Sequence, residues 1–73
     1  MNKTIYIYLL NEGTPVWRPT QGLALDGNKF RVLATKDYDP GEEHWEFPPG
    51  SIVYCEAQIK NGEQLLIAVS HVE

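Results

Sequence analysis

The residue types with the clearest chemical potential are carboxylates gathered in one short stretch. This acidic cluster consists of Asp37, Asp39, Glu42, Glu43 and Glu46. A calcium ion prefers several carboxylate oxygens from one loop, so the spacing can be compared with that of an EF-hand. Counted from Asp37, the sixth and twelfth positions are Glu42 and Pro48, where an EF-hand loop has glycine and glutamate. The spacing therefore favours a solvated acidic loop over a calcium site.

Two histidines and a single cysteine offer a second kind of chemistry. His44 stands beside Glu43, as in acid–base pairs and metal sites, but only the fold could bring His71 to it. Cys55 lies in an apolar run, where we expect a buried thiol with a raised pKa. The chain has no zinc-ligand spacing, nucleophile motif or glycine-rich phosphate loop. We therefore predict a protein that is not an enzyme and that has no catalytic residues, no metal site and no cofactor.

Two motifs that combine tryptophan with proline are the most informative feature. Trp17-Arg18-Pro19 and Trp45-Glu46-Phe47-Pro48-Pro49-Gly50 contain both tryptophans of the chain. Tryptophan, tyrosine and arginine are enriched at protein-binding hot spots, and small barrels also bury large aromatic side chains in their cores. We expect one tryptophan in the core and the other partly exposed. If the motifs meet in space, we expect an ion pair between Arg18 and Glu46.

These motifs define the candidate partner-binding surface. It consists of Trp17, Arg18, Trp45 and Glu46, together with Tyr38 from the adjacent acidic loop. Such a surface suits a basic or proline-rich peptide, because aromatic rings can dock polyproline helices. The sequence thus predicts a non-catalytic protein-interaction module or small accessory subunit.

The elements that must position these residues have the pattern of β-strands. Apolar residues alternate with others, with some interruptions, in segments 4–10, 16–25, 30–35, 51–59 and 64–71. Pro19 interrupts the second segment and indicates an edge or a bulge there. Asp26-Gly27 and Asn61-Gly62 predict hairpin turns, and the polar segment 36–44 predicts the longest loop. No window has the apolar spacing of a long helix.

About five short strands in 73 residues predict a single β-barrel domain over residues 1–73. Closure into a barrel hides the edges of so small a sheet, and we expect a small antiparallel SH3-like barrel. An OB-type barrel is the alternative, although it is usually longer and often contains a helix.

Three segments of the chain resemble a family of small uncharacterised bacterial proteins. Residues 8–13 (YLLNEG), 17–19 (WRP) and 45–53 (WEFPPGSIV) match that family's LLxEGxxVWRP and WEFPPGxxV motifs. The resemblance covers most of the chain and implies a compact β domain of bacterial origin. It implies no catalytic residues, because the family has no established activity.

Charge and hydropathy indicate the classes of partner. The net charge is −4, and the basic residues are scattered: Lys3, Arg18, Lys29, Arg31, Lys36 and Lys60. Binding to a phosphate backbone needs a concentrated positive face, so the composition argues against nucleic acid unless folding aligns Arg18, Lys29 and Arg31. No segment has the roughly 20 apolar residues of a membrane span or the pattern of a signal peptide, which predicts no membrane contact and a cytoplasmic location.

A homodimer with a structural role is the main alternative to the interaction module. Tyr6, Tyr8 and Leu10 would leave an apolar strip exposed on the first strand. Pairing of the first or the last strand with a second copy would cover such a strip.

Overall fold

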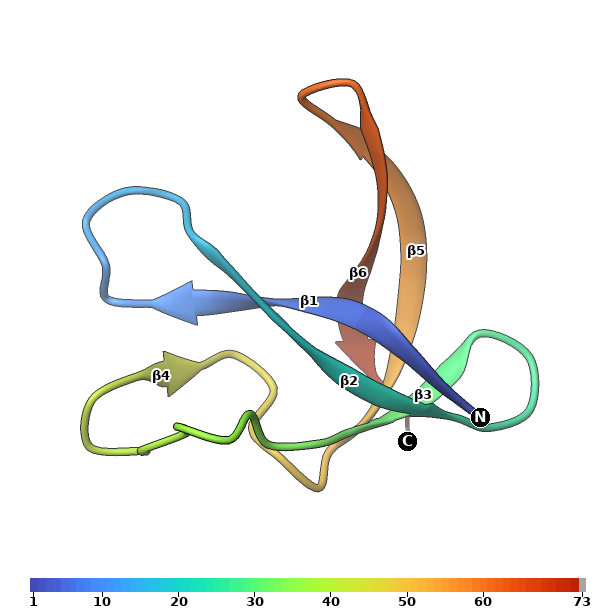
Figure 1. Ribbon diagram of the computed structural model, residues 1–73, viewed down its shortest axis with the longest axis horizontal. Helices are drawn as coiled ribbons and strands as arrows, with labels where there is room; N and C mark the ends of the chain where they lie inside the picture. The colour runs from blue at the N-terminus through green and yellow to red at the C-terminus, as the bar shows by residue number, and fades with distance from the viewer. Residues whose placement is uncertain (73) are drawn as a thin grey trace.

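The computed structural model describes residues 1–72 and shows an all-β chain (Figure 1). Its strands are β1 (Asn2–Leu10), β2 (Trp17–Ala24), β3 (Lys29–Val32), β4 (His44–Trp45), β5 (Ile52–Lys60) and β6 (Glu63–His71). Residues 1–72 contain no helix, and hence none that could cross a membrane. The predicted small β-barrel without a long helix is confirmed. A sixth, two-residue strand, β4, adds to the five that the sequence predicts.

The strands form a ring in the order β2-β3-β5-β6-β1, and β1 pairs with β2 to close it, while β4 lies on the edge of β1. Every pairing is antiparallel except that of β1 with β6, which meet at one parallel bridge between Tyr6 and Ile67. This seam is where the otherwise antiparallel barrel has a parallel contact. Five strands that alternate in direction around a closed ring must bring two parallel strands together at one position.

Both predicted hairpin turns are present. Leu25 N donates to Lys29 O at 2.9 Å across the Asp26-Gly27 turn. Asn61 and Gly62 have φ angles of 51° and 81°, as a two-residue turn with two left-handed residues requires. Asparagine and glycine adopt these angles at little cost, so the turn fixes the register of β5 and β6.

The inner face of the ring is apolar because β1 alternates strictly. Ile5, Ile7 and Leu9 are buried, and the tyrosines between them face outward. Gly22 of β2 crosses Ile5 so closely that a Cβ atom would lie 2.8 Å from Ile5 Cδ1. The other strands and the segment after β4 complete the core with Phe30, Val32, Trp45, Phe47, Val53, Cys55 and Ala68.

Pro19 lies where β2 has a neighbour on only one side. It is opposite Tyr6 of β1, whereas β3 reaches β2 only at residues 22–24. Because Leu9 N donates to Val16 O, hydrogen-bonded pairs fall on alternate residues of this hairpin, and the Pro19 nitrogen points away from β1. Proline therefore removes a donor from the open edge without breaking the ladder, and the prediction of an edge position is confirmed.

The paired strands β5 and β6 extend beyond the ring. β3 pairs with β5 only at residues 52–54, so residues 56–67 form a two-stranded arm that projects from the barrel (Figure 1). Cys55 is buried at the base of the arm, as expected. Ala57 and Ile59, which the alternation assigns to the same apolar face, are exposed instead because the core ends before the arm does.

Candidate functional site

The structure divides the predicted binding residues between two places. Arg18, Tyr38 and Trp45 gather around Glu43, at the junction of β2, β4 and the long loop. Trp17 lies on the opposite face of β2 from Arg18, because adjacent strand residues point to opposite faces. Glu46 is exposed and makes no side-chain hydrogen bond or ion pair with another residue of the described chain. The five predicted residues therefore do not form one continuous surface.

Glu43 is the centre of the first group. Arg18 Nη2 donates to Glu43 Oε2 and forms an ion pair with it, and Trp45 Nε1 donates to Glu43 Oε1 at 2.8 Å. The hydrogen bond from Trp45, followed by that from Arg18, holds the pKa of the Glu43 carboxyl below its ordinary value of 4.5. The carboxylate thus joins β2 to β4 and satisfies an indole N–H at the core boundary.

The sequence predicts an ion pair between Arg18 and Glu46, and this prediction is wrong. The acidic partner of Arg18 in the structure is Glu43. Trp45 is 5% exposed and points into the ring, so alternation turns the next residue, Glu46, outward. Glu43 lies two residues before Trp45, where its carboxylate reaches both the indole and Arg18. Tyr38 packs against Trp45 with ring centroids 4.7 Å apart and an interplanar angle of 68°, which anchors the acidic loop to the core.

Trp17 belongs to an aromatic groove outside the ring. Its ring packs edge-on against Tyr8 with centroids 5.3 Å apart, and the Lys60 ammonium lies 4.8 Å from its centroid. Tyr8 is opposite Trp17 in the pairing of β1 with β2, whereas Lys60 comes from the end of the arm, whose residues line the same groove. Of the two tryptophans, one is buried and one is half-buried, as expected.

The groove lies between the β1–β2 hairpin and the arm and encloses about 300 Å³. Its lining consists of Tyr6, Pro15, Trp17, Lys60, Asn61, Leu65 and Ile67. Ile67 is 5% exposed but lies outside the core cluster, which shows that the molecule has a second apolar layer on its outer side. The groove is therefore a concave, largely aromatic and aliphatic surface.

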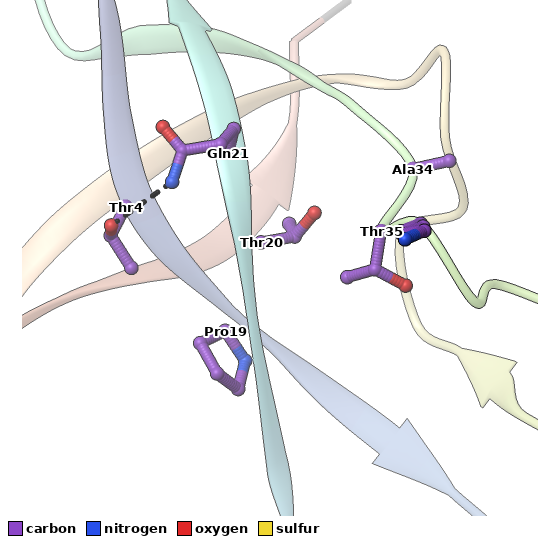
Figure 2. A pocket seen from close by; sticks show the side chains of 7 residues that line it. Thr4, Pro19, Thr20, Gln21, Ala34 and Thr35 are labelled. Atoms are coloured by element: carbon purple, nitrogen blue, oxygen red, sulfur yellow. Dashed lines mark hydrogen bonds between the residues drawn. The ribbon is translucent and has the colours of Figure 1, made fainter.

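Besides the groove, two hollows with polar linings lie along the open edge of β2. Figure 2 shows the first, of about 370 Å³, between β2 and the segment that follows β3. Three of its polar side chains are already hydrogen-bonded, because Gln21 Nε2 donates to Thr4 Oγ1 at 3.2 Å and Thr20 Oγ1 donates to Leu33 O at 2.6 Å. The second hollow is lined by Arg18, Thr35, Lys36, Asp37 and Glu43, where charges of both signs alternate. Within residues 1–72, the buried Arg18 Nε of the second hollow has no hydrogen-bond partner, and the charge of this guanidinium is balanced by Glu43.

The groups with nucleophilic or metal-binding potential are separated. Burial raises the pKa of the Cys55 thiol to about 11, so the sulfur is protonated at neutral pH. His44 Nδ1 lies 3.4 Å from the Asn11 amide, and His71 packs edge-on against Phe47. Among residues 1–72, no group of three histidine, cysteine or acidic residues could hold a metal ion.

Sequence reasoning missed the arm's contribution to the groove, which is Lys60, Asn61, Leu65 and Ile67. The Asn61-Gly62 turn signals the hairpin itself, but nothing in the alternation indicates that the hairpin bends over β1. Comparisons with protein-family models, curated proteins and solved structures found no match to this chain.

Proposed function

We propose that this chain is a non-catalytic protein-interaction module, or small accessory subunit, that binds a proline-rich segment of a partner protein in the aromatic groove. The observation that carries the proposal is the half-buried Trp17, held edge-on by Tyr8 in an apolar concavity of about 300 Å³. Cytoplasmic location and bacterial origin stay predictions from the sequence.

The groove has the shape and side chains that a polyproline helix requires. Proline rings stack on aromatic faces, and Tyr6 and Trp17 line the groove with Pro15 beside them. A polyproline helix is already extended and loses little conformational entropy on binding, which suits a small rigid surface. The groove thus favours proline-rich over purely basic segments, because its one charged side chain, Lys60, is itself basic.

Hydrogen-bond donors are also available in the groove. Polyproline carbonyl groups are not bonded within their own helix and need donors from the receptor. Three lining residues have side chains that can donate, namely Tyr6 with its hydroxyl, Asn61 with its amide and Lys60 with its ammonium. Lys60 would leave the face of Trp17 and donate to a peptide carbonyl, while a proline ring takes its place on the indole.

The experiment is a titration of the isotope-labelled protein with a synthetic oligoproline peptide, followed by NMR. We expect the Trp17 indole signal and the backbone amides of Tyr6 and Leu65 to shift first. Trp17→Ala should weaken binding by at least about tenfold, as loss of a hot-spot residue does. Tyr54→Ala is the matched control, because Tyr54 is 41% exposed on β5 but does not line the groove.

Three outcomes would contradict this proposal. The first is that oligoproline causes no shifts at any concentration, and the second is that Trp17→Ala and Tyr54→Ala weaken binding equally. The third is that an oligolysine peptide without proline binds more tightly than oligoproline, which would indicate recognition by the acidic loop.

A further inference from the structure

The outer edge of β5 is open along the arm. Cys55 N donates to Asn28 O at 2.9 Å, on the side of β5 away from β6. Backbone groups on a strand point to alternate sides, so those of Ala57 and Ile59 also point away from β6. Within residues 1–72, no strand pairs with this side of β5 beyond its base. The N–H and C=O groups of Ala57 and Ile59 are therefore unpaired along the outer edge of segment 56–60.

This edge lacks two of the features that usually protect a free edge, proline and a β-bulge, and its charged residues, Glu56 and Lys60, are opposite in sign. The open edge of β2 has Pro19, which removes a donor, whereas residues 56–60 contain neither proline nor a bulge. Ile59 is 70% exposed, and Ala57 on the same face is also exposed. Such an edge is a template for another strand.

We propose that the edge of β5 formed by residues 56–60 pairs with the same edge of a second copy of this chain, antiparallel and centred on Gln58. In this register Ala57 of each copy is opposite Ile59 of the other. Both residues point their backbone groups outward, so they form the hydrogen-bonded pairs of an antiparallel ladder.

Charge complementarity selects this register and the second copy as the occupant. The segment Glu56-Ala57-Gln58-Ile59-Lys60 has an acid at one end and a base at the other. When it pairs with itself about Gln58, Glu56 of each copy is directly opposite Lys60 of the other. Centring on Ala57 or Ile59 keeps the backbone groups in phase but loses both ion pairs.

The pairing also covers the exposed apolar side chains. Side chains alternate across the strand, so Ala57 and Ile59 of both copies form one apolar strip, and the charged pairs occupy the other face. Lys60 then lies between Trp17 of its own chain and Glu56 of the second copy. The result is a continuous sheet in which the two β5 strands are central. This inference does not rest on the proposed function, because it is argued from the backbone edge and its charges, although Lys60 belongs to both this edge and the groove.

Analytical ultracentrifugation of charge variants tests both the dimer and its register. The wild type should form a reversible dimer whose population rises with concentration, because an interface of a few residues per chain is smaller than the roughly 1,200 Å² of stable complexes. E56K and K60E should each raise the dimer dissociation constant about tenfold, since each places like charges opposite one another. An equal mixture of E56K and K60E should dimerise as well as the wild type, because all its cross-strand pairs are opposite in sign.

Amide hydrogen exchange gives a second readout at the backbone. The amides of Ala57 and Ile59 should become protected as concentration rises, whereas that of Gln58, which faces Leu65 within the arm, should be protected at every concentration. Circular dichroism confirms that each variant is folded. A wild type that stays monomeric up to about 1 mM would overturn the proposal. So would a mixture of E56K and K60E that remains monomeric while the wild type dimerises.

Discussion

The two tryptophans occupy contrasting environments on the two faces of one hairpin. Trp45 is 5% exposed, and its indole N–H is satisfied by Glu43. Trp17 is half-buried under the ammonium end of the Lys60 side chain, and no residue of 1–72 accepts a hydrogen bond from its indole. Both have a tyrosine packed edge-on against them. Aromatic packing alone therefore does not distinguish a core tryptophan from a surface tryptophan. The burial of the side chain and a hydrogen-bond acceptor for its indole N–H do.

The largest expected effect is on the free energy of unfolding, which substitution of Trp45 should lower far more than substitution of Trp17. Trp45→Ala should lower the free energy of unfolding by about 3–5 kcal/mol, because it leaves a cavity in the core and removes the donor to Glu43 Oε1. A domain of this size has only a few kcal/mol of stability to lose, so the variant should be largely unfolded in circular dichroism at room temperature.

Trp17→Ala is the matched comparison for Trp45→Ala. It removes a half-buried side chain outside the core, so urea denaturation should show a loss of about 1 kcal/mol and a folded protein. Equal losses for the two variants would mean that the outer apolar layer stabilises the fold as much as the core does. That result would remove the distinction on which the groove proposal depends.

The next effect concerns the hairpin that separates the two environments. Gly22→Ala should destabilise the protein by about 1–3 kcal/mol, because the new Cβ meets Ile5 Cδ1 at 2.8 Å and Ile5 is completely buried. Ile5→Val removes that Cδ1 atom. In a double-mutant cycle measured by urea denaturation, the double variant should be more stable than the sum of the single effects predicts. Strict additivity would show that β1 and β2 move apart to accommodate the methyl group.

The sequence was sufficient for features set by local pattern and turn chemistry. Alternation in residues 4–10 gives a strand whose isoleucines are buried, and Asn61-Gly62 gives the hairpin found there. The position of Pro19 on an open edge follows from its missing donor in the same way. These features depend only on neighbours in the chain, so a single sequence contains them.

Features that depend on distant segments could not be predicted in the same way. The acidic partner of Arg18 depends on how the long loop returns to β2, and both Glu43 and Glu46 stand close to Trp45 in sequence. The bend of the arm over Trp17 depends on β6 meeting β1 at one bridge. No property of Lys60 or Ile67 in the sequence encodes that crossing, so the groove emerges only in three dimensions.

A smaller effect tests the polar partner that distinguishes Trp45. Glu43→Gln keeps an acceptor for the indole but removes the charge that faces Arg18, and should cost about 1 kcal/mol at neutral pH. The folded state lowers the pKa of Glu43, so its charge stabilises the fold fully above the ordinary value of 4.5. That contribution is lost as the pH falls through the lower pKa of the folded state.

The unfolding free energies of the wild type and of Glu43→Gln should therefore converge on acidification. Urea denaturation from pH 7 down to below 4.5 measures this convergence, and the other carboxyl groups cancel because both proteins contain them. A difference that stays constant with pH would show that the Glu43 charge does not contribute to the junction.

The smallest expected effect concerns the surface partner of Trp17. Lys60→Met keeps the length and apolar stem of the side chain but removes the ammonium that lies 4.8 Å from the indole centroid. Cation–π pairs at exposed sites contribute about 0.5–1 kcal/mol, so the stability loss in urea should be at the limit of detection.

Trp17 fluorescence is the more sensitive measurement, and Trp45→Phe supplies a background in which Trp17 is the only tryptophan. In that background Lys60→Met should change the emission, whereas Lys36→Met, far from the groove lining, should not. Identical spectra for both variants would mean that Lys60 does not rest on Trp17 in solution and that the groove is open without a ligand.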